Sequence, residues 1–179
     1  MKWIKHFVRC LRIFSLLPQM KILLGHLNSN GDCLFATVIA RQIKEVDYPG
    51  CHLTWAVNSK CRQSIELNPY VDEIWEIPTE KAVTNQKEWD DFIVQVEARK
   101  AEKDFDLVFL TQIIGDKWIN YDGGVRSSIY GNYPNEISVS HQPVIHLSAA
   151  EIEDVKRFAE NHQLTDYRNV VLVECGPDS

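Results

Sequence analysis

The sequence predicts an α/β protein with a Rossmann-like, mainly parallel sheet and helices on both faces. Short apolar runs, typical of buried parallel strands, alternate with longer segments whose apolar residues recur at helical spacing. Glycine, proline and asparagine residues punctuate the chain where these elements should end. The chain has 179 residues, of which 45% are hydrophobic. A chain of this size can bury a core without metals or disulfides.

The first predicted strand covers residues 20–27, because the run MKILLGHL is short and mostly apolar. A polar loop follows it. Apolar residues then recur at helical spacing over residues 33–46, until a proline–glycine pair ends the helix. The run HLTWAV predicts a second strand at 52–57, and residues 59–67 predict a short helix.

The second half of the pattern continues in the same order. Residues 71–77 alternate between polar and apolar and predict a third strand, and the charged segment 80–103 predicts a helix. The run DLVFLT predicts a fourth strand at 106–111. Residues 112–140 are polar, aromatic and glycine-containing without a clear period, and a loop of that length is usually functional or partly disordered. Strands that alternate with helices indicate a mainly parallel sheet.

The end of the chain carries three further signals. Residues 144–147 predict a short fifth strand. Ser148 and Glu151 have capping-box spacing, so a helix should cover 149–162. The run NVVLVE predicts a last strand at 169–174. Because the chain stops soon after this strand, we expect it to be the front part of a longer protein, with a frayed edge strand as the alternative.

Residues 1–19 predict an amphipathic helix that precedes the sheet. Basic residues interrupt its apolar face, which makes the segment too short and too charged for a membrane span. No small-residue cleavage site follows it, so it is a poor signal peptide. Two interpretations stay open: the helix packs against the domain, or residues 1–17 make a peripheral membrane contact.

Composition excludes several classes of function. The formal net charge is −6, which disfavours nucleic acid as a partner. The five cysteines form no CxxC pair and the six histidines are scattered, so neither a metal site nor a cofactor is expected. An odd number of cysteines without a disulfide pattern is typical of reduced thiols, and we expect a cytoplasmic protein, in contact with the inner membrane if residues 1–17 bind it.

The loop at residues 28–32 is the first candidate site. Ligands of open parallel sheets bind beyond the carboxyl ends of the strands, and backbone N–H groups at a helix start attract polar oxygens. The loop has one glycine and no following Gly-Lys-Ser/Thr, so it is neither a dinucleotide fingerprint nor a P-loop. Asp32 at its end either caps the helix or acts as a general base on a bound hydroxyl. In the later loop, Arg126 is the best candidate for a ligand contact, and an ordinary solvated loop is the alternative.

Three segments in order resemble the start of the heptosyltransferases, glycosyltransferase family 9. The first is ILLGHLNSNGDCLFATVIARQIK, around Gly31 and Asp32. The second is Tyr48-Pro49-Gly50 followed by HLTWAV, and the third is NPYVDEI at residues 68–74. The closing VVLVECGP is similar to the strand and glycine turn that open the family's second domain.

The resemblance implies the N-terminal half of a GT-B fold, with an acceptor-binding domain at 20–166 and the start of a truncated donor-binding domain at 167–179. Such enzymes are inverting and need no metal, and they move heptose from ADP-heptose to the growing core of bacterial lipopolysaccharide in cell-envelope biosynthesis. In this chain Asp32 would be the general base. The residues that would line the same cleft are Asn28, Ser29, Asn30 and Gly31. The nucleotide-sugar site would lie mostly outside this chain, so the isolated chain should be inactive.

One departure keeps other functions open. Many members of the family carry Arg-Leu at the end of the first strand, where this chain has His26-Leu27. A histidine cannot replace a fixed guanidinium in phosphate binding. The alternatives are a non-catalytic, truncated or diverged α/β binding module, and a Rossmann-like nucleotide binder.

Overall fold

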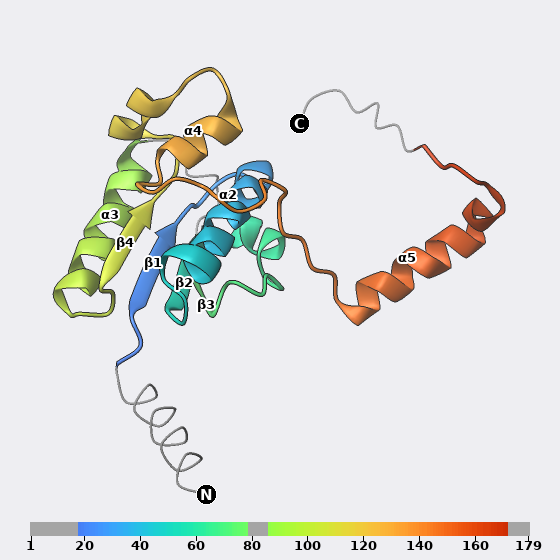
Figure 1. Ribbon diagram of the computed structural model, residues 1–179, viewed down its shortest axis with the longest axis horizontal. Coiled ribbons are helices and arrows are strands. Elements are labelled where there is room, and N and C mark those ends of the chain that lie inside the picture. Colours follow the sequence, from blue (N-terminus) through green and yellow to red (C-terminus); the bar gives the residue numbers. More distant parts are fainter. Residues whose placement is uncertain (1–17, 79–85, 172–179) are drawn as a thin grey trace, which may run out of the picture. The chain divides into compact units, whose positions relative to one another are not determined.

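The computed structural model describes residues 18–78 and 86–171, and the chain divides into two compact units after Ile145. The first unit contains a parallel sheet with the strand order β3-β2-β1-β4 (Figure 1). Its strands are β1 (Lys21–Gly25), β2 (His52–Asn58), β3 (Glu73–Ile77) and β4 (Leu107–Leu110). The predicted fold class, a Rossmann-like parallel sheet, is confirmed.

Helices cover both faces of this sheet. Helix α2 (Asn30–Gln42) lies on one face and α3 (Gln86–Ala101) on the other (Figure 1). Side chains of a strand alternate between the two faces. In β1, Ile22 and Leu24 therefore join the core cluster of α2, and Leu23 joins that of α3. A strand that is buried on both sides must be apolar throughout, which is why the strand pattern was clear in the sequence.

The strand order places a topological switch point between β1 and β4. From β1 the chain passes through α2 to β2 on one side, and from β3 it crosses through α3 to β4 on the other side of β1. The connections that leave β1 and β4 therefore diverge at the carboxyl edge of the sheet. A crevice at such a point is where open α/β sheets bind ligands.

Several helix boundaries differ from those predicted. Helix α2 begins at Asn30 rather than residue 33 and continues as a π-helical turn, Ile43–Asp47. The predicted helix at 59–67 is a shorter 3₁₀ helix, η2 (Ser59–Ser64), which the Asn58 side chain starts by accepting a hydrogen bond from the Lys60 backbone N–H at 2.9 Å. Helix α3 covers only part of the predicted 80–103, and residues 79–85 lie outside the described chain.

The segment 112–140 contains two short helices that the sequence did not reveal. They are the 3₁₀ helix η3 (Gly115–Asn120) and the α-helix α4 (Val125–Gly131). Each spans about two turns or fewer, which is too short to produce a recognisable apolar period.

The predicted strand at 144–147 is wrong. Val144 is buried, but side chains occupy its backbone groups: its N–H donates to Thr37 Oγ1 at 2.8 Å, and its carbonyl accepts from Asn68 Nδ2 at 3.4 Å. No strand of the described sheet pairs with this segment. The predicted strand at 169–174 is also wrong for residues 169–171, which are not in a strand, and residues 172–174 lie outside the described chain.

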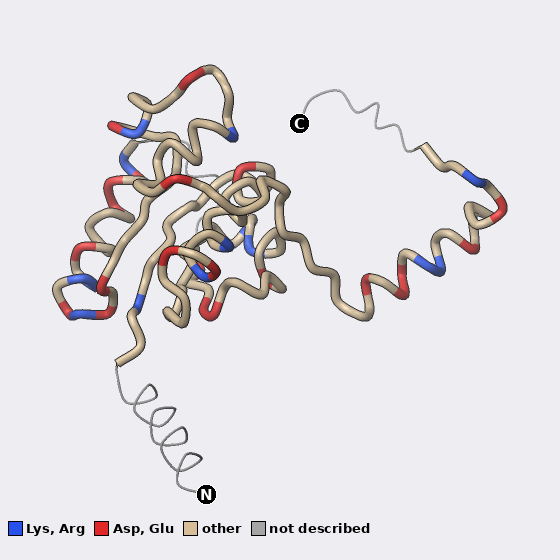
Figure 2. Tube along the Cα trace, in the orientation of Figure 1, with Lys and Arg blue, Asp and Glu red and all other residues tan. Residues whose placement is uncertain are grey.

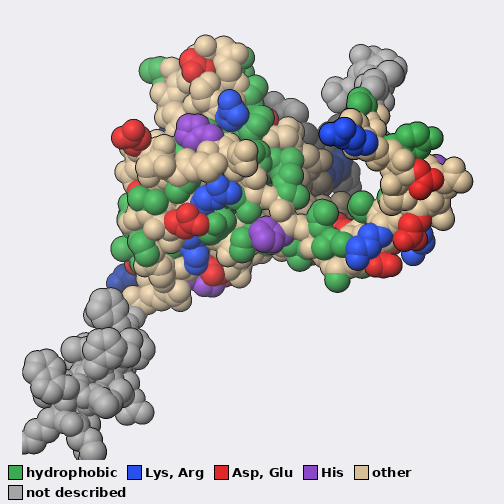
Figure 3. Space-filling model, turned by 45° about the vertical axis from the view of Figure 1, so that its right-hand side comes forward, with side chains coloured by type: hydrophobic (Ala, Val, Ile, Leu, Met, Phe, Trp, Pro, Cys, Tyr) green, Lys and Arg blue, Asp and Glu red, His purple; other side chains and the backbone are tan. Residues whose placement is uncertain are grey.

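The second unit begins at His146 and contains helix α5 (Ala149–Asn161) and a 3₁₀ turn, Leu164–Asp166. The predicted capping box is confirmed: the Glu151 N–H donates to Ser148 Oγ at 3.1 Å, and the Ser148 N–H donates to Glu151 Oε2 at 2.7 Å. Apolar side chains are visible on the surface of this unit (Figure 3). The predicted division into domains at 20–166 and 167–179 stays a prediction.

The amphipathic helix predicted at the amino terminus lies almost wholly outside the described chain, which begins at Pro18. Within the described residues, no helix combines the length and the apolar character that crossing a bilayer would require.

Candidate functional site

A single amide joins the two loops of the switch point. Gln112, which follows β4, accepts hydrogen bonds at its Oε1 from the backbone N–H groups of Leu27 and Asn28, at 3.0 and 2.9 Å. Gln112 is itself buried. The loop that leaves β1 is therefore held against the end of β4 by a residue 84 positions away in the chain.

His26 supports the same junction from inside the core. It is fully buried, its Nδ1 is hydrogen-bonded to Thr111 Oγ1 at 3.0 Å, and its carbonyl accepts from Trp55 Nε1 at 3.0 Å. Burial lowers the pKa of His26 from 6.5 to about 4, although hydrogen bonds with the backbone of Asn28 and Thr111 oppose the shift. At neutral pH the imidazole is therefore uncharged. It cannot supply the cation that arginine would supply at this position.

The loop beyond His26 turns outward to solvent. Asn28 is buried, whereas Ser29, Asn30 and Gly31 are exposed. Ser29 is the N-cap of α2, and Asn30 Oδ1 accepts a hydrogen bond from Ser64 Oγ of η2 at 2.9 Å. Three of the four predicted lining residues thus lie where a ligand could reach them.

Asp32 occupies the third position of α2 and is half-buried. Ser29, and not Asp32, is therefore the N-cap residue of α2, so the predicted alternative that Asp32 is the N-cap is wrong. The Asp32 carboxylate instead reaches back to accept hydrogen bonds from the backbone N–H and the hydroxyl of Ser29. Burial raises the pKa of Asp32, and this effect outweighs the two hydrogen bonds, which lower it. The carboxylate is therefore a stronger base than an ordinary aspartate.

Arg126 lines a separate cavity of about 540 Å³ between α2 and α4. Its Cζ lies 5.9 Å from the centroid of the Phe35 ring. Phe35 stands three residues after Asp32, so the two side chains are neighbours on α2. The other residues that line the cavity are Gly124, Val125, Ser127, Tyr130 and His141. No lining residue is acidic, and helix α2 links this cavity to Asp32.

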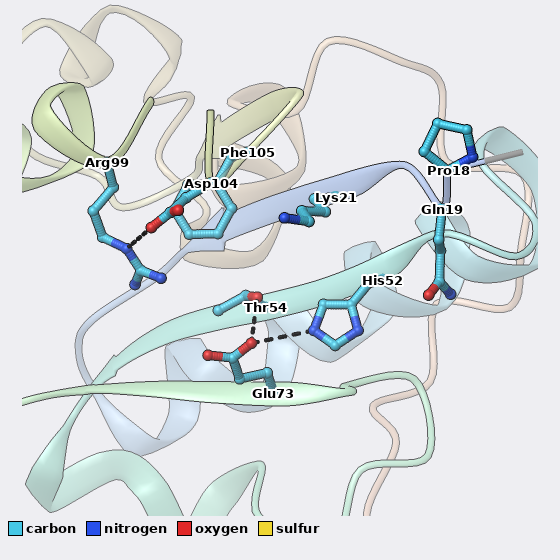
Figure 4. A pocket seen from close by; sticks show the side chains of 9 residues that line it. All are labelled: Pro18, Gln19, Lys21, His52, Thr54, Glu73, Arg99, Asp104 and Phe105. Atoms are coloured by element: carbon cyan, nitrogen blue, oxygen red, sulfur yellow. Dashed lines mark hydrogen bonds and ion pairs between the residues drawn. The ribbon is translucent and has the colours of Figure 1, made fainter. Parts of the chain in front are cut away.

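A second cavity of about 340 Å³ opens at the opposite, amino edge of the sheet (Figure 4). Its charged side chains largely satisfy one another. His52 Nε2 lies 3.2 Å from Glu73 Oε2, and Arg99 Nε donates to Asp104 Oδ2 at 2.8 Å (Figure 4). Because ligands of open parallel sheets bind at the carboxyl edge, we assign the functional site to the loop at 28–32.

Sequence reasoning missed three residues of the carboxyl edge. Gln112 and His141 are distant in sequence from the loop at 28–32, and no local sequence pattern predicts their contacts. Phe35 had a local signal, since it follows Asp32 at helical spacing. Among residues 18–78 and 86–171, no group of three or more His, Cys, Asp or Glu side chains could hold a metal ion.

Among solved structures, the crystal structure of the glycosyl transferase family 9 from Veillonella parvula DSM 2008 is similar to this chain. The superposition has a TM-score of 0.55 at 14% sequence identity and covers 82% of this chain and 51% of that one. This chain thus spans about half the length of that protein, and the likeness shows a shared fold. No family model and no curated protein sequence matches the chain.

The buried neutral His26 predicts a specific dependence of stability on pH. Its folded pKa lies below its unfolded value, so its contribution to stability is complete above about pH 6.5 and is lost as the pH falls toward 4. Urea unfolding should show a free energy that falls by about 2 kcal/mol between about pH 7 and about pH 5 because of this residue. The substitution His26→Gln should remove most of that dependence.

The control is His146→Gln, which changes an exposed histidine and should leave the pH dependence intact. An NMR titration of the His26 imidazole provides a second readout if the glutamine variant fails to fold. Titration of His26 near its ordinary pKa would contradict the burial described here.

Proposed function

We propose that this chain is the acceptor-binding portion of an inverting, metal-independent glycosyltransferase. The enzyme would move a sugar, heptose in the first instance, from a nucleotide sugar such as ADP-heptose to a lipopolysaccharide-type or other glycan acceptor. The observation that carries the proposal is the half-buried Asp32 carboxylate, with its raised pKa, at the carboxyl edge of the sheet. The similarity in fold to a structure described as a glycosyl transferase family 9 protein supports it.

Asp32 would act as the general base. Its carboxylate would take the proton from an acceptor hydroxyl while the hydroxyl oxygen attacks the anomeric carbon of the donor sugar. The bond from that carbon to the nucleotide would break on the opposite face, which inverts the configuration. A pKa raised by burial suits this role, because a base works best when its pKa approaches the working pH. The exposed loop at 29–31 offers backbone and side-chain groups to position the acceptor.

Arg126 would bind an outer part of the acceptor. Its cavity combines a guanidinium, the Phe35 and Tyr130 rings and the Ser127 hydroxyl. Aromatic faces and hydrogen-bond donors together suit a sugar ring, and the absence of carboxylates in the lining favours a ligand that carries negative charge. Phe35 of this cavity lies one turn after Asp32 on α2, so one extended acceptor would reach both places.

The donor would bind a second domain that begins at residues 167–179 and continues beyond this chain. The similar structure supports this arrangement, because this chain covers only 51% of it. The isolated chain would then hold the acceptor but transfer no sugar. We also propose a cytoplasmic location, with residues 1–17 as a peripheral contact with the inner membrane.

A non-catalytic α/β binding module is the second candidate. The observation in its favour is His26, which is buried and neutral. Many members of the glycosyltransferase family that the sequence resembles carry an arginine at this point. Such a module would bind a glycan or a lipid headgroup at the same loop, and it would not need Asp32 as a base.

Titration calorimetry separates the two candidates and the nucleotide-binding alternative. ADP and ADP-heptose should not bind to the 179-residue chain, and they should bind to the longest natural polypeptide that contains it. Binding to the 179-residue chain would move the nucleotide site to the loop at 28–32 and contradict the proposed division. If neither protein binds ADP or ADP-heptose, the non-catalytic module is favoured.

The substitution Asp32→Asn tests the catalytic role in the polypeptide that transfers sugar. Asparagine keeps the oxygen that accepts from Ser29, so α2 should still begin correctly. Turnover should fall by about 10²–10⁴, the range for loss of a general base. In the unsubstituted enzyme the rate should fall as the pH drops through the pKa of Asp32, at a higher pH than for an ordinary aspartate.

Asp116→Asn is the matched control, because it removes an exposed carboxylate from η3 at the same edge of the sheet. It should leave turnover unchanged. Equal turnover of the Asp32→Asn variant and the unsubstituted enzyme would reduce Asp32 to a residue of the helix start.

A further inference from the structure

Three large apolar side chains are exposed together on η3 and at its C-cap, beyond the carboxyl end of β4. Trp118 is 56% exposed, Ile119 88% and Tyr121 44%. The Trp118 and Tyr121 rings meet edge to face, with their centroids 5.2 Å apart. We call these three residues the aromatic tip. Contiguous exposed apolar groups of this kind mark sites of interaction rather than ordinary surface.

The aromatic tip is held in place from behind. Ile114, just before η3, is buried in the core cluster of α3, and its carbonyl accepts from the Lys117 N–H at 3.1 Å. Asn120 Nδ2 donates to Asn132 Oδ1 at 2.8 Å, which ties the end of η3 to the end of α4. These contacts anchor both ends of η3, and the three apolar side chains of the aromatic tip are exposed on that base.

Charge at the aromatic tip is balanced. Residues 115–131 contain two acidic and two basic side chains, and few charges interrupt this part of the trace (Figure 2). Asp116 and Lys117, two neighbours of opposite charge, directly precede the tip in the chain. The Asp122 carboxylate is engaged at the start of α4, where it accepts from the Gly124 N–H at 2.9 Å and from Ser127 Oγ at 2.8 Å. The tip therefore offers a partner apolar area and no net charge.

We propose that the aromatic tip inserts into the interfacial region of a lipid bilayer. Tryptophan and tyrosine favour that region because their rings are apolar and their N–H and O–H groups remain hydrated, and isoleucine adds apolar transfer energy. A protein partner fits less well, since a stable protein interface buries about 800 Å² on each side and involves about 20 residues or more. Three protruding side chains are enough for shallow insertion into lipid.

The aromatic tip lies at the same edge of the sheet as the candidate site. Segment η3 follows β4 at the carboxyl edge, which is also the edge that carries the loop at 28–32. A bilayer that receives the tip would therefore face the side of the sheet where a lipid-linked headgroup could be bound. The inference does not depend on the proposed sugar transfer, and its test measures no transfer.

Quenching of tryptophan fluorescence by brominated lipid locates the contact in the full chain. The chain has five tryptophans, of which Trp55 and Trp89 are buried and Trp75 packs against Phe92 and Phe105. The substitution Trp3→Phe removes the tryptophan within residues 1–17, and Trp118 is then the most exposed of the four tryptophans that remain. Vesicles of brominated phosphatidylcholine should quench the Trp3→Phe variant and should not quench the Trp3→Phe/Trp118→Phe variant. Quenching should persist at high salt, because the tip has no net charge to be screened.

A matched pair of charge insertions provides the control. Ile119→Asp should lower partition into the vesicles about tenfold or more, because the apolar side chain that would enter the lipid is lost and a charge is added. Val94→Asp, at a 68% exposed position of α3, should leave partition unchanged. Equal quenching of the two tryptophan variants, no quenching of either, or equal partition of Ile119→Asp and Val94→Asp would each overturn the proposal.

Discussion

The Gln112 amide is the interaction on which the carboxyl edge depends. A parallel sheet with helices on both faces leaves the backbone groups at its strand ends to be satisfied by loops. Here one buried side-chain oxygen accepts the two N–H groups that leave β1, at 3.0 and 2.9 Å. Since Gln112 follows β4, this contact joins the two sides of the switch point. It fixes where the loop at 28–32 turns outward and where α2 begins.

Burial shifts the pKa values of two titratable groups near this junction in opposite directions, and each shift favours the uncharged form. His26 loses its proton because burial disfavours the imidazolium. Asp32 holds its proton more tightly, because burial outweighs the hydrogen bonds from Ser29. His26, inside the junction, is therefore uncharged, and Asp32, beside it, is a carboxylate of increased basicity. That arrangement suits proton abstraction from a hydroxyl better than it suits binding of a phosphate.

The elements that could be predicted from the sequence are those whose burial produces a recognisable spacing of apolar residues. All four strands of the sheet were expected within a few residues: β1, β2 and β4 are short, mostly apolar runs, and β3 alternates between polar and apolar residues. The start of α2 was misplaced because Ser29 and Asp32 are both acceptable residues at a helix start. The prediction of a strand at 144–147 was wrong because the apolar pattern does not reveal that the side chains of Thr37 and Asn68 hydrogen-bond to the backbone of Val144. The contacts of Gln112 span 84 and 85 residues, and no local pattern encodes them.

We propose that Asp32 is a base prepared by its surroundings, and a carboxyl ¹³C NMR titration of the 179-residue chain tests this directly. We expect the Asp32 carboxyl to titrate above the ordinary value for an aspartate. We expect it to return toward that value in a Phe35→Ala variant, because loss of this neighbouring ring on α2 would admit water. An Asp32 pKa at or below the ordinary value would show that the hydrogen bonds from Ser29 prevail. Asp32 would then be a structural residue of the helix start, and the proposed chemistry would lose its base.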